Sequence, residues 1–491
     1  MDPGCASRGS KARDLWALAG ITALGAGIRL GTLGVQSFDH DETATVQVVA
    51  SSLGGLVHGV EHLERSPPLF YALAWLWAKL FGIGQLHLRT LAALIGIATI
   101  PIGFWAAKEL GGSRRARLIA ATFFALNPYL VWYSQELRSY GLMAMFATVG
   151  LGFFGRAMRS PSRRSLGAWA IASSLALCSH YFAAFLIAPE ALWLLLRSPR
   201  RRRALAATAA IAVVGLGLLP LAIHQQGGDR ANGYADTSLV GRAGASLADF
   251  TASEEPDPPV GPRPEAFVIV VGAGGALLLA SGIALGLRGG PERERRGIAA
   301  SAGIGLAAFA LPVALALAGF DLFKPHNLIG VLPPLLLAAA IGFGAARLPR
   351  LGLAGAAVLC ALFAGVVVAV NLDPNLQRPD WRGAATAIGP APDGRAIVAP
   401  YLAAKPLAFY LGAKQLEGGG RGCVRVDQLD VLSTKRLVAA PDRGFELAGT
   451  DSLPSGLTLR RYRARRQVCL APTDLNLLRG ATIAMVQPPR R

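Results

Sequence analysis

The chain has 491 residues, of which 53% are hydrophobic and 16% are charged, and its formal net charge at pH 7 is +19. Long uncharged stretches recur along it, which excludes an ordinary soluble enzyme and indicates a polytopic helical membrane protein. Most basic residues lie in short clusters between these stretches. The positive charge is therefore typical of a topology signal, and it is no evidence for nucleic-acid binding.

The first apolar stretch, 15–33, is long enough to cross a bilayer and is not followed by a convincing cleavage site, which predicts a retained helix. The basic clusters are expected on the cytoplasmic side, together with the N-terminus. They lie in the ranges 8–13, 108–117, 156–164, 197–203, 288–296 and 347–350.

The stretch 67–82 decides the topology. It is short, rich in Trp and Tyr, and contains Lys79, which is typical of an interfacial helix. If it crossed the membrane, every later basic cluster would lie outside. We therefore expect about eleven spans. They are 15–33, 88–107, 116–132, 139–155, 166–179, 182–196, 204–223, 266–287, 298–318, 328–346 and 351–370.

The outer face then includes a first loop, 34–87, with a weakly amphipathic surface helix at 43–57, and a mobile loop at 227–264 that is rich in Gly, Asp and Pro. From 372 onward the apolar stretches shorten. Strand patterns at 395–400, 421–431 and 457–462, with a helix at 403–410, predict a small α/β domain. The expected organisation is a membrane domain, 1–371, followed by an extracytoplasmic domain, 372–491. Spacing leaves open whether Cys423 and Cys469 form a disulfide there.

Unusual polar groups gather at the outer surface of this topology. The acids Asp39, Asp41 and Glu42 directly follow the first span, and ionisable residues near lipid are costly unless they have a function. Between later spans lie further polar segments, namely 134–140, His180 with Tyr181, and 324–327. A carboxylate there can deprotonate an acceptor hydroxyl, and Arg138 or Lys324 can neutralise a phosphate leaving group. A solvated loop, a helix cap and an interfacial anchor are the structural alternatives.

The order of motifs resembles a known family. Asp41-Glu42, the 67–71 segment (PPLFY), 127–129 (NPY), 133–140 (YSQELRSY), His180-Tyr181, the 324–334 stretch and 380–382 (DWR) follow one another along the chain. In this order they resemble the GT-C glycosyltransferases that use polyprenyl-phosphate sugars. The resemblance covers about residues 15–385 and is to the bacterial family-39-like group, related to protein O-mannosyltransferases and lipid A aminoarabinose transferases.

The resemblance implies the GT-C fold and an inverting transfer from a polyprenyl-phosphate monosaccharide. Asp41 would be the general base, and Glu42 would orient it or contact the acceptor. The substrate-binding residues would be Glu136, Arg138, Tyr140, His180, Lys324 and His326. No cofactor is certain, and a divalent metal at Glu136 stays open. Asp39 is a rival to Asp41, and Ser66 stands where relatives often have His.

The resemblance also implies a bacterial cytoplasmic membrane location, with a glycan, lipid or protein acceptor on the outer face. The alternative interpretation is a transporter or lipid flippase. It explains the spans, but transporters place substrate groups near the membrane midplane, whereas these acids lie at one surface. A polysaccharide polymerase or ligase is less favoured, because the 227–264 loop has few basic residues.

Overall fold

The computed structural model describes residues 3–226, 237–253, 265–345, 347, 349–391, 394–415, 424–433, 444–453, 456–470 and 482–487. The chain forms two compact units. The first comprises Met1–Leu33, Val48–Glu254 and Glu265–Val368, and the second comprises Gly34–Gln47, Glu255–Pro264 and Ala369–Arg491.

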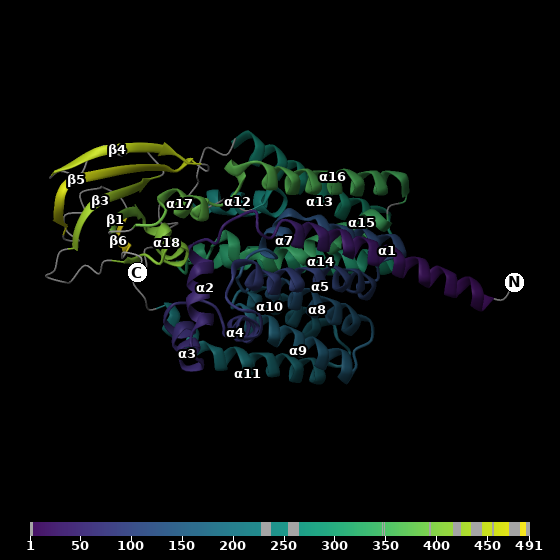
Figure 1. Cartoon of the computed structure of the whole chain (residues 1–491). Coiled ribbons are helices and arrows are strands. Elements are labelled where there is room, and N and C mark those ends of the chain that lie inside the picture. Colours follow the sequence, from purple (N-terminus) through teal and green to yellow (C-terminus); the bar gives the residue numbers. More distant parts are fainter. Residues whose placement is uncertain are drawn as a thin grey trace. The chain divides into compact units, whose positions relative to one another are not determined.

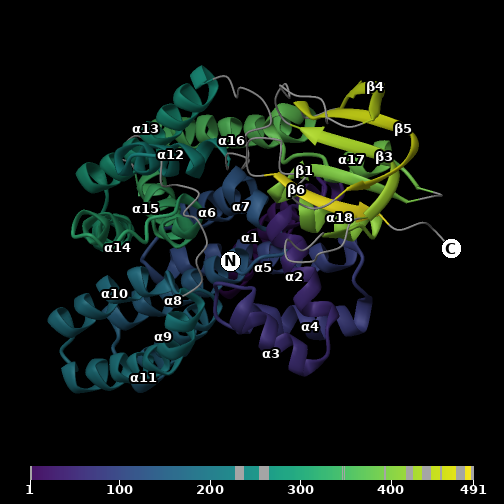
Figure 2. The same ribbon diagram turned by 90° about the vertical axis from the view of Figure 1, so that its left-hand side faces the viewer.

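The first unit is helical, and in both views its helices α8, α9 and α11 lie side by side (Figures 1 and 2). The helices up to the end of the last apolar stretch are α1 Pro3–Gly31, α2 His40–Ala50, α3 Leu53–His62, α4 Leu69–Phe81, α5 Gln85–Glu109, α6 Arg114–Leu126, α7 Pro128–Tyr133, α8 Tyr140–Arg159, α9 Arg163–Ser179, α10 Ala183–Arg197, α11 Arg201–Gln226, α12 Leu239–Ala252, α13 Glu265–Gly289, α14 Glu292–Leu317, η1 Pro325–Val331, α15 Leu332–Ala345 and α16 Pro349–Leu372.

Seven helices of the described residues are long and apolar enough to cross a membrane. This confirms a polytopic helical membrane protein. The number is smaller than the expected eleven, partly because α6, α9 and α10 have only 13, 17 and 15 residues. Helix α4 is also short, with 13 residues, as expected for an interfacial segment.

Three predictions of local structure were wrong. The third span is not continuous, because Asn127 ends α6 and Pro128 begins the short helix α7. The single surface helix expected at 43–57 is two helices, since Ser52 caps the start of α3 with its side chain. The loop expected at 227–264 contains α12, which Ser238 caps and which buries Phe250. The remainder of that loop lies outside the described residues.

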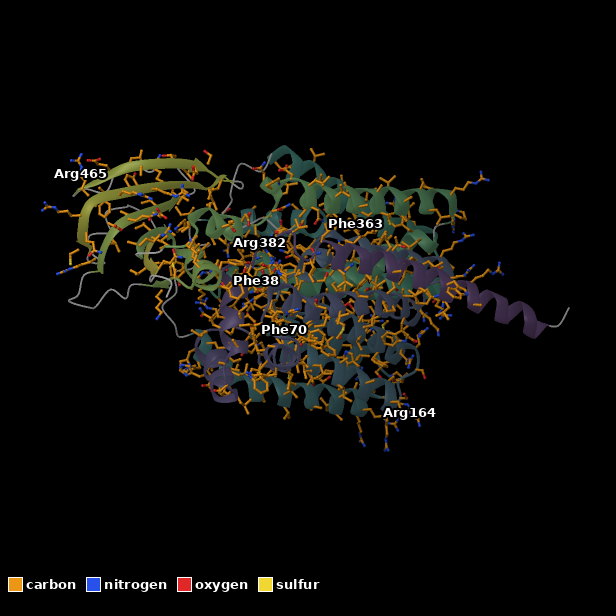
Figure 3. All side chains as sticks on the ribbon, in the orientation of Figure 1. Phe38, Phe70, Arg164, Phe363, Arg382 and Arg465 are labelled. Atoms are coloured by element: carbon orange, nitrogen blue, oxygen red, sulfur yellow. The ribbon has the colours of Figure 1, made fainter. Side chains whose placement is uncertain are left out.

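Small residues and aromatic rings fill the helix contacts of the first unit. A Cβ built on Gly342 of α15 would lie 2.0 Å from the carbonyl oxygen of Gly282 on α13, so these two helices touch through their backbones. Phe363 of α16, marked in Figure 3, lies with its ring centroid 6.0 Å from that of Phe123 on α6. The core thus joins helices from both halves of the unit.

The second unit contains the predicted α/β domain. Its described strands form a six-stranded sheet in the order β2-β6-β1-β3-β5-β4, in which only β1 and β3 are parallel. The strands are β1 Arg395–Pro400, β2 Lys414–Gln415, β3 Val424–Ser433, β4 Phe445–Ser452, β5 Thr458–Leu470 and β6 Thr482–Gln487. The remaining helical segments are η2 Pro374–Leu376, α17 Trp381–Ile388, η3 Tyr401–Ala403 and α18 Ala404–Leu411.

Alternation along the strands gives this sheet two apolar faces. On one face, Leu459 packs with Trp381 of α17 and Leu407 of α18, and both helices lie beside the sheet in Figure 1. On the other face, Tyr462 packs with Val398. Cys469 of β5 is disulfide-bonded, whereas Cys423 lies outside the described residues.

Gly297 of α14 provides a test of close packing. A Cβ built there would lie 1.9 Å from the carbonyl oxygen of Leu110. Gly297→Ala should therefore destabilise the protein by about 1–3 kcal/mol, the usual cost of overpacking. Gly303→Ala in the same helix is the matched control, since nothing lies within 4 Å of its Cβ position. Thermal unfolding of both variants in detergent checks this, and equal melting temperatures would contradict it.

Candidate functional site

A buried ion pair is the centre of the polar cluster in the first unit. Nη1 of Arg138, in the loop between α7 and α8, lies 2.5 Å from Oε2 of Glu64, in the loop between α3 and α4. The Tyr71 hydroxyl of α4 donates to the same oxygen at 2.8 Å. The Glu64 side chain is only 1% exposed, so this pair is almost completely desolvated. Arg138 is thus neutralised within the protein, which sequence reasoning did not foresee.

The break between α6 and α7 directs the loop that contains Arg138. Pro128 has no N–H and ends the helical ladder, and the side chain of Asn127 accepts a hydrogen bond from the Leu130 N–H at 3.0 Å. The Asn127 amide also donates to the Phe250 carbonyl of α12 at 2.8 Å. Helix α7 therefore starts from a fixed point, and the 134–139 loop that follows it contains the buried side chains of Glu136 and Arg138.

Aromatic and imidazole rings surround Tyr140, the first residue of α8. Its ring centroid lies 4.8 Å from that of Tyr133, 5.4 Å from that of His180 and 5.8 Å from that of His326. Burial lowers the pKa of His180 to about 3, and the neighbouring His326 and Arg138 lower it further in the same direction. His180 is therefore neutral at physiological pH. Arg138, Tyr140, His180 and His326 form one cluster, contributed by three separate segments of the chain.

Lys324 stands at the entrance of η1 in the same unit, where its side chain is half-buried. The Tyr129 hydroxyl of α7 donates to the carbonyl of Pro325 at 3.2 Å, which holds the start of η1 against α7. The lysine thus belongs to the segment that also brings His326 to the ring cluster.

The acidic segment after the first span belongs to the second unit. Asp39 caps α2, because its Oδ1 accepts from the Glu42 N–H at 2.7 Å, and Glu42 Oε2 accepts from the Asp39 N–H at 3.4 Å. This reciprocal arrangement is a capping box. Nη1 of Arg378 lies 3.2 Å from Oε2 of Glu42, and its Nε lies 3.6 Å from Oδ2 of Asp39. Asp41, in the same first turn, is exposed.

The tail of the chain surrounds this acidic segment. Ser37 donates to the Pro379 carbonyl and accepts from the Trp381 N–H, both at 3.0 Å. The Phe38 N–H donates to the Tyr410 hydroxyl at 2.9 Å. Residues 34–42 are therefore held by the segment that opens the α/β domain and by α18.

Burial also acts on the Asp39 carboxyl, raising its pKa to about 6 against the opposing effect of Arg378. Asp39 therefore has a capping role and an ion pair with Arg378. Glu64, Tyr71 and Arg378 were missed by sequence reasoning. Glu64 is an acid three residues before the Pro67-Pro68 pair, and Arg378 stands two residues before Asp380, so both lie beside motifs already singled out.

Among the described residues, no three His, Cys, Asp or Glu side chains are arranged to hold a metal ion. Glu136 is buried, with 5% of its surface exposed, and it belongs to no such group in the described part of the chain. The described residues around it therefore do not fit a metal held by three protein ligands.

Removing the charge of Glu64 should have a large effect. Glu64→Gln leaves the buried guanidinium of Arg138 without its counter-ion, which costs about 3–5 kcal/mol when one partner of a buried pair is lost. Tyr71→Phe removes only a hydrogen bond to the same oxygen, worth about 1 kcal/mol. Thermal unfolding of both variants, of Arg138→Gln and of Glu64→Gln/Arg138→Gln measures the coupling between Glu64 and Arg138. Additive losses in the double variant would show that the two groups do not interact.

His180 should make stability depend on pH. The unfolded state takes up the proton near pH 6.5, whereas the folded state resists it down to about pH 3, so acidification in that window favours unfolding. The loss is at most about 1.4 kcal/mol for each pH unit. The fall in melting temperature from pH 7.5 to 5 should be smaller in His180→Asn than in the wild type. His87→Asn, at an exposed position, should behave like the wild type.

Comparison with known proteins gives a match of part of the chain to one family model, and a fold. Residues 65–224 match the sequence model of the dolichyl-phosphate-mannose-protein mannosyltransferase family. Apo ArnT from Cupriavidus metallidurans superposes with a TM-score of 0.58 at 14% identity, over 92% of this chain and 98% of that one. ArnT bound to undecaprenyl phosphate gives a TM-score of 0.55 at 13% identity, over 90% and 97%.

No curated protein sequence matches the chain significantly. The family match begins one residue after Glu64 and includes the α6–α7 break, Arg138, Tyr140 and His180, whereas Lys324 and His326 lie beyond it. The fold match extends over 92% of the chain. The chain therefore has the GT-C fold, and its residues 65–224 match the mannosyltransferase family model.

Proposed function

We propose that this protein is a membrane glycosyltransferase that transfers a monosaccharide from a polyprenyl phosphate to an acceptor. The observation that carries the proposal is the likeness of 90% of the chain to ArnT in complex with undecaprenyl phosphate. The polar clusters support it, because they supply a carboxylate, cations and rings outside the apolar helices. The transporter alternative has no comparable support.

The phosphate of the donor needs positive charge as the sugar leaves. Arg138 alone contributes little net charge, because Glu64 neutralises it. Lys324 is therefore proposed to carry the charge that holds the phosphate, with Arg138 and His326 donating hydrogen bonds. Tyr140 and His180 would face the sugar, and neutral His180 can accept or donate a hydrogen bond without adding charge. Glu136 would contact the donor from the same loop.

Asp41 is proposed as the general base. An acceptor hydroxyl oxygen attacks the anomeric carbon, its proton passes to the Asp41 carboxylate, and the bond from carbon to phosphate oxygen breaks with its electron pair on the phosphate. Attack opposite the leaving group inverts the configuration. Glu42 would orient the segment through its ion pair with Arg378, whose guanidinium also lies near Asp39.

The proposed location is the cytoplasmic membrane of a bacterium, with the N-terminus in the cytoplasm and the reaction on the outer face. The basic clusters support this orientation by the positive-inside rule. The acceptor is a glycan, a lipid or a protein of the cell envelope.

The test uses purified full-length protein in lipid vesicles, a panel of polyprenyl-phosphate monosaccharides and a membrane extract as acceptor. Release of polyprenyl phosphate is measured for the wild type, Asp41→Asn and Asp39→Asn. Asparagine caps helices well, so Asp39→Asn should retain α2 and serves as the matched control. We expect Asp41→Asn to lose about 10²–10⁴-fold in rate, the usual contribution of a general base, and Asp39→Asn to stay active.

The reverse result, an inactive Asp39→Asn with an active Asp41→Asn, would show that Asp39 is the base. Activity in both variants would exclude an aspartate base in this segment. No release from any donor, with lipid-linked sugar crossing the vesicle membrane instead, would favour the transporter.

A further inference from the structure

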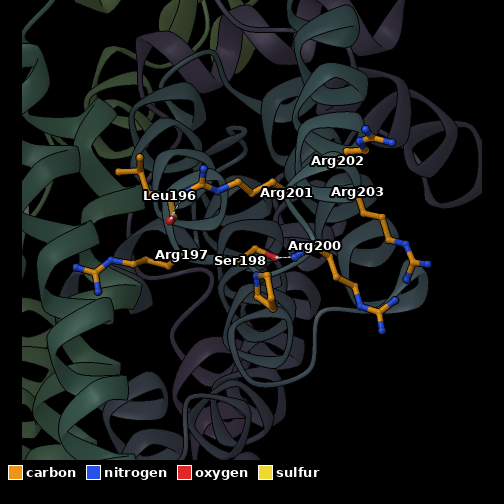
Figure 4. A pocket seen from close by; sticks show the side chains of 8 residues that line it. Leu196, Arg197, Ser198, Arg200, Arg201, Arg202 and Arg203 are labelled. Carbon is orange, nitrogen blue, oxygen red and sulfur yellow. Dashed lines mark hydrogen bonds between the residues drawn. The ribbon is translucent and has the colours of Figure 1, made fainter.

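A hollow lined with arginines lies between α10 and α11, at the opposite end of α10 from His180. It has a volume of about 700 Å³ and is lined by residues 196–203, which include five arginines (Figure 4). This volume is within the range of roughly 300–1,000 Å³ that ligand pockets have. The backbone of the loop is fixed, because the Arg200 N–H donates to Ser198 Oγ and the Arg203 N–H donates to the Arg200 carbonyl.

In the described part of the chain, none of the five arginines of this hollow forms an ion pair with Asp or Glu, whereas Arg114 pairs with Asp14 and Arg156 pairs with Glu109. The exposed arginines at the start of α9 share this lack of an acid in the first turn. What sets the hollow apart is that five arginines gather in one short segment.

Helix electrostatics make the arrangement unfavourable without an anion. Arg201, Arg202 and Arg203 occupy the first turn of α11, which contains no acidic residue. The N-terminus of a helix carries partial positive charge and favours anions, not cations. Arg201 turns back to the Leu196 carbonyl at the end of α10, but Arg200 and Arg202 project outward in Figure 4. A bound anion would remove this repulsion.

The surroundings of the hollow fit a lipid. Leu192 and Leu196 of α10 and Leu205 of α11 are 58%, 59% and 58% exposed, so an apolar surface adjoins the arginines. The Arg197 guanidinium lies 6.0 Å from the ring of Trp193, and Trp is typical of the membrane interface. Arginine forks bind phosphate oxygens in pairs.

We propose that this hollow binds an anionic phospholipid, with the phosphate at Arg200 and Arg202 and an acyl chain along the leucines. A free phosphate ion would offer the arginines the same oxygens as a lipid phosphate, and the test below distinguishes the two ligands. The site lies outside the proposed catalytic cluster, so its occupancy can be measured without any glycosyl transfer.

The test is native mass spectrometry of the full-length protein in detergent, titrated with phosphatidylglycerol, with phosphatidylcholine or with inorganic phosphate. Arg200→Gln/Arg202→Gln is compared with Arg163→Gln/Arg164→Gln. The control also removes two exposed arginines from a helix start, and Arg164 points outward there in Figure 3. Arg200→Lys/Arg202→Lys keeps the charge and loses the forked geometry. It keeps the proposal testable if the glutamine variant does not fold.

We expect phosphatidylglycerol to bind the wild type at least tenfold more tightly than phosphatidylcholine. The Arg200→Gln/Arg202→Gln variant should lose that preference, the lysine variant should keep part of it, and the Arg163→Gln/Arg164→Gln variant should keep all of it. Equal binding of phosphatidylglycerol to both glutamine variants would overturn the proposal. Displacement of phosphatidylglycerol by an equal concentration of inorganic phosphate would make the hollow a site for free anions and would also overturn it.

Discussion

The backbone break at Asn127-Pro128 is the constraint on which the first unit's site depends. Carbonyls freed inside a membrane helix have no water to bind, so the protein must supply donors. Arg29 of α1 does this, donating to the carbonyls of Phe124 and Ala125 at 2.9 Å each. Its side chain is fully buried, with 1% exposed. Helix α1 is thereby tied to α6 where α6 ends, and α7 can leave in a new direction that brings the loop of Arg138 to Glu64.

That geometry has an electrostatic consequence. A buried guanidinium paired with a carboxylate is well placed to donate hydrogen bonds, but it supplies almost no net charge to a phosphate. The pair therefore fixes the shape of the site, and the charge must come from elsewhere. Lys324 is half-buried and lies in another segment of the chain, directly before η1. Tyr129 of α7 holds the start of η1 in place. The same broken helix thus orders both the loop of Arg138 and the segment that contains Lys324.

Sequence reasoning predicted a polytopic membrane protein and most of its helices, because a helix that crosses a membrane needs a long apolar stretch and basic clusters mark its ends. The short helix α4 and the strand β1 were predicted for the same reason, since both are local patterns. The pairing of Glu64 with Arg138 and of Arg378 with Glu42 could not be predicted, because each joins residues more than 70 positions apart. Helix α12 was missed because its glycines indicate a loop, whereas its helical phase buries Phe250 and Asp249.

The α/β domain contacts the acidic segment, although the two are more than 300 residues apart in the sequence. Arg378 holds Asp39 and Glu42, Tyr410 holds the backbone of Phe38, and Ser37 joins the backbone at Pro379 and Trp381. These contacts occupy Asp39 and Glu42 in capping and ion pairing. Asp41, between them in the chain, is exposed in the same turn. If Asp41 is the base, the tail of the chain holds in place the segment that contains the residue that removes the acceptor proton.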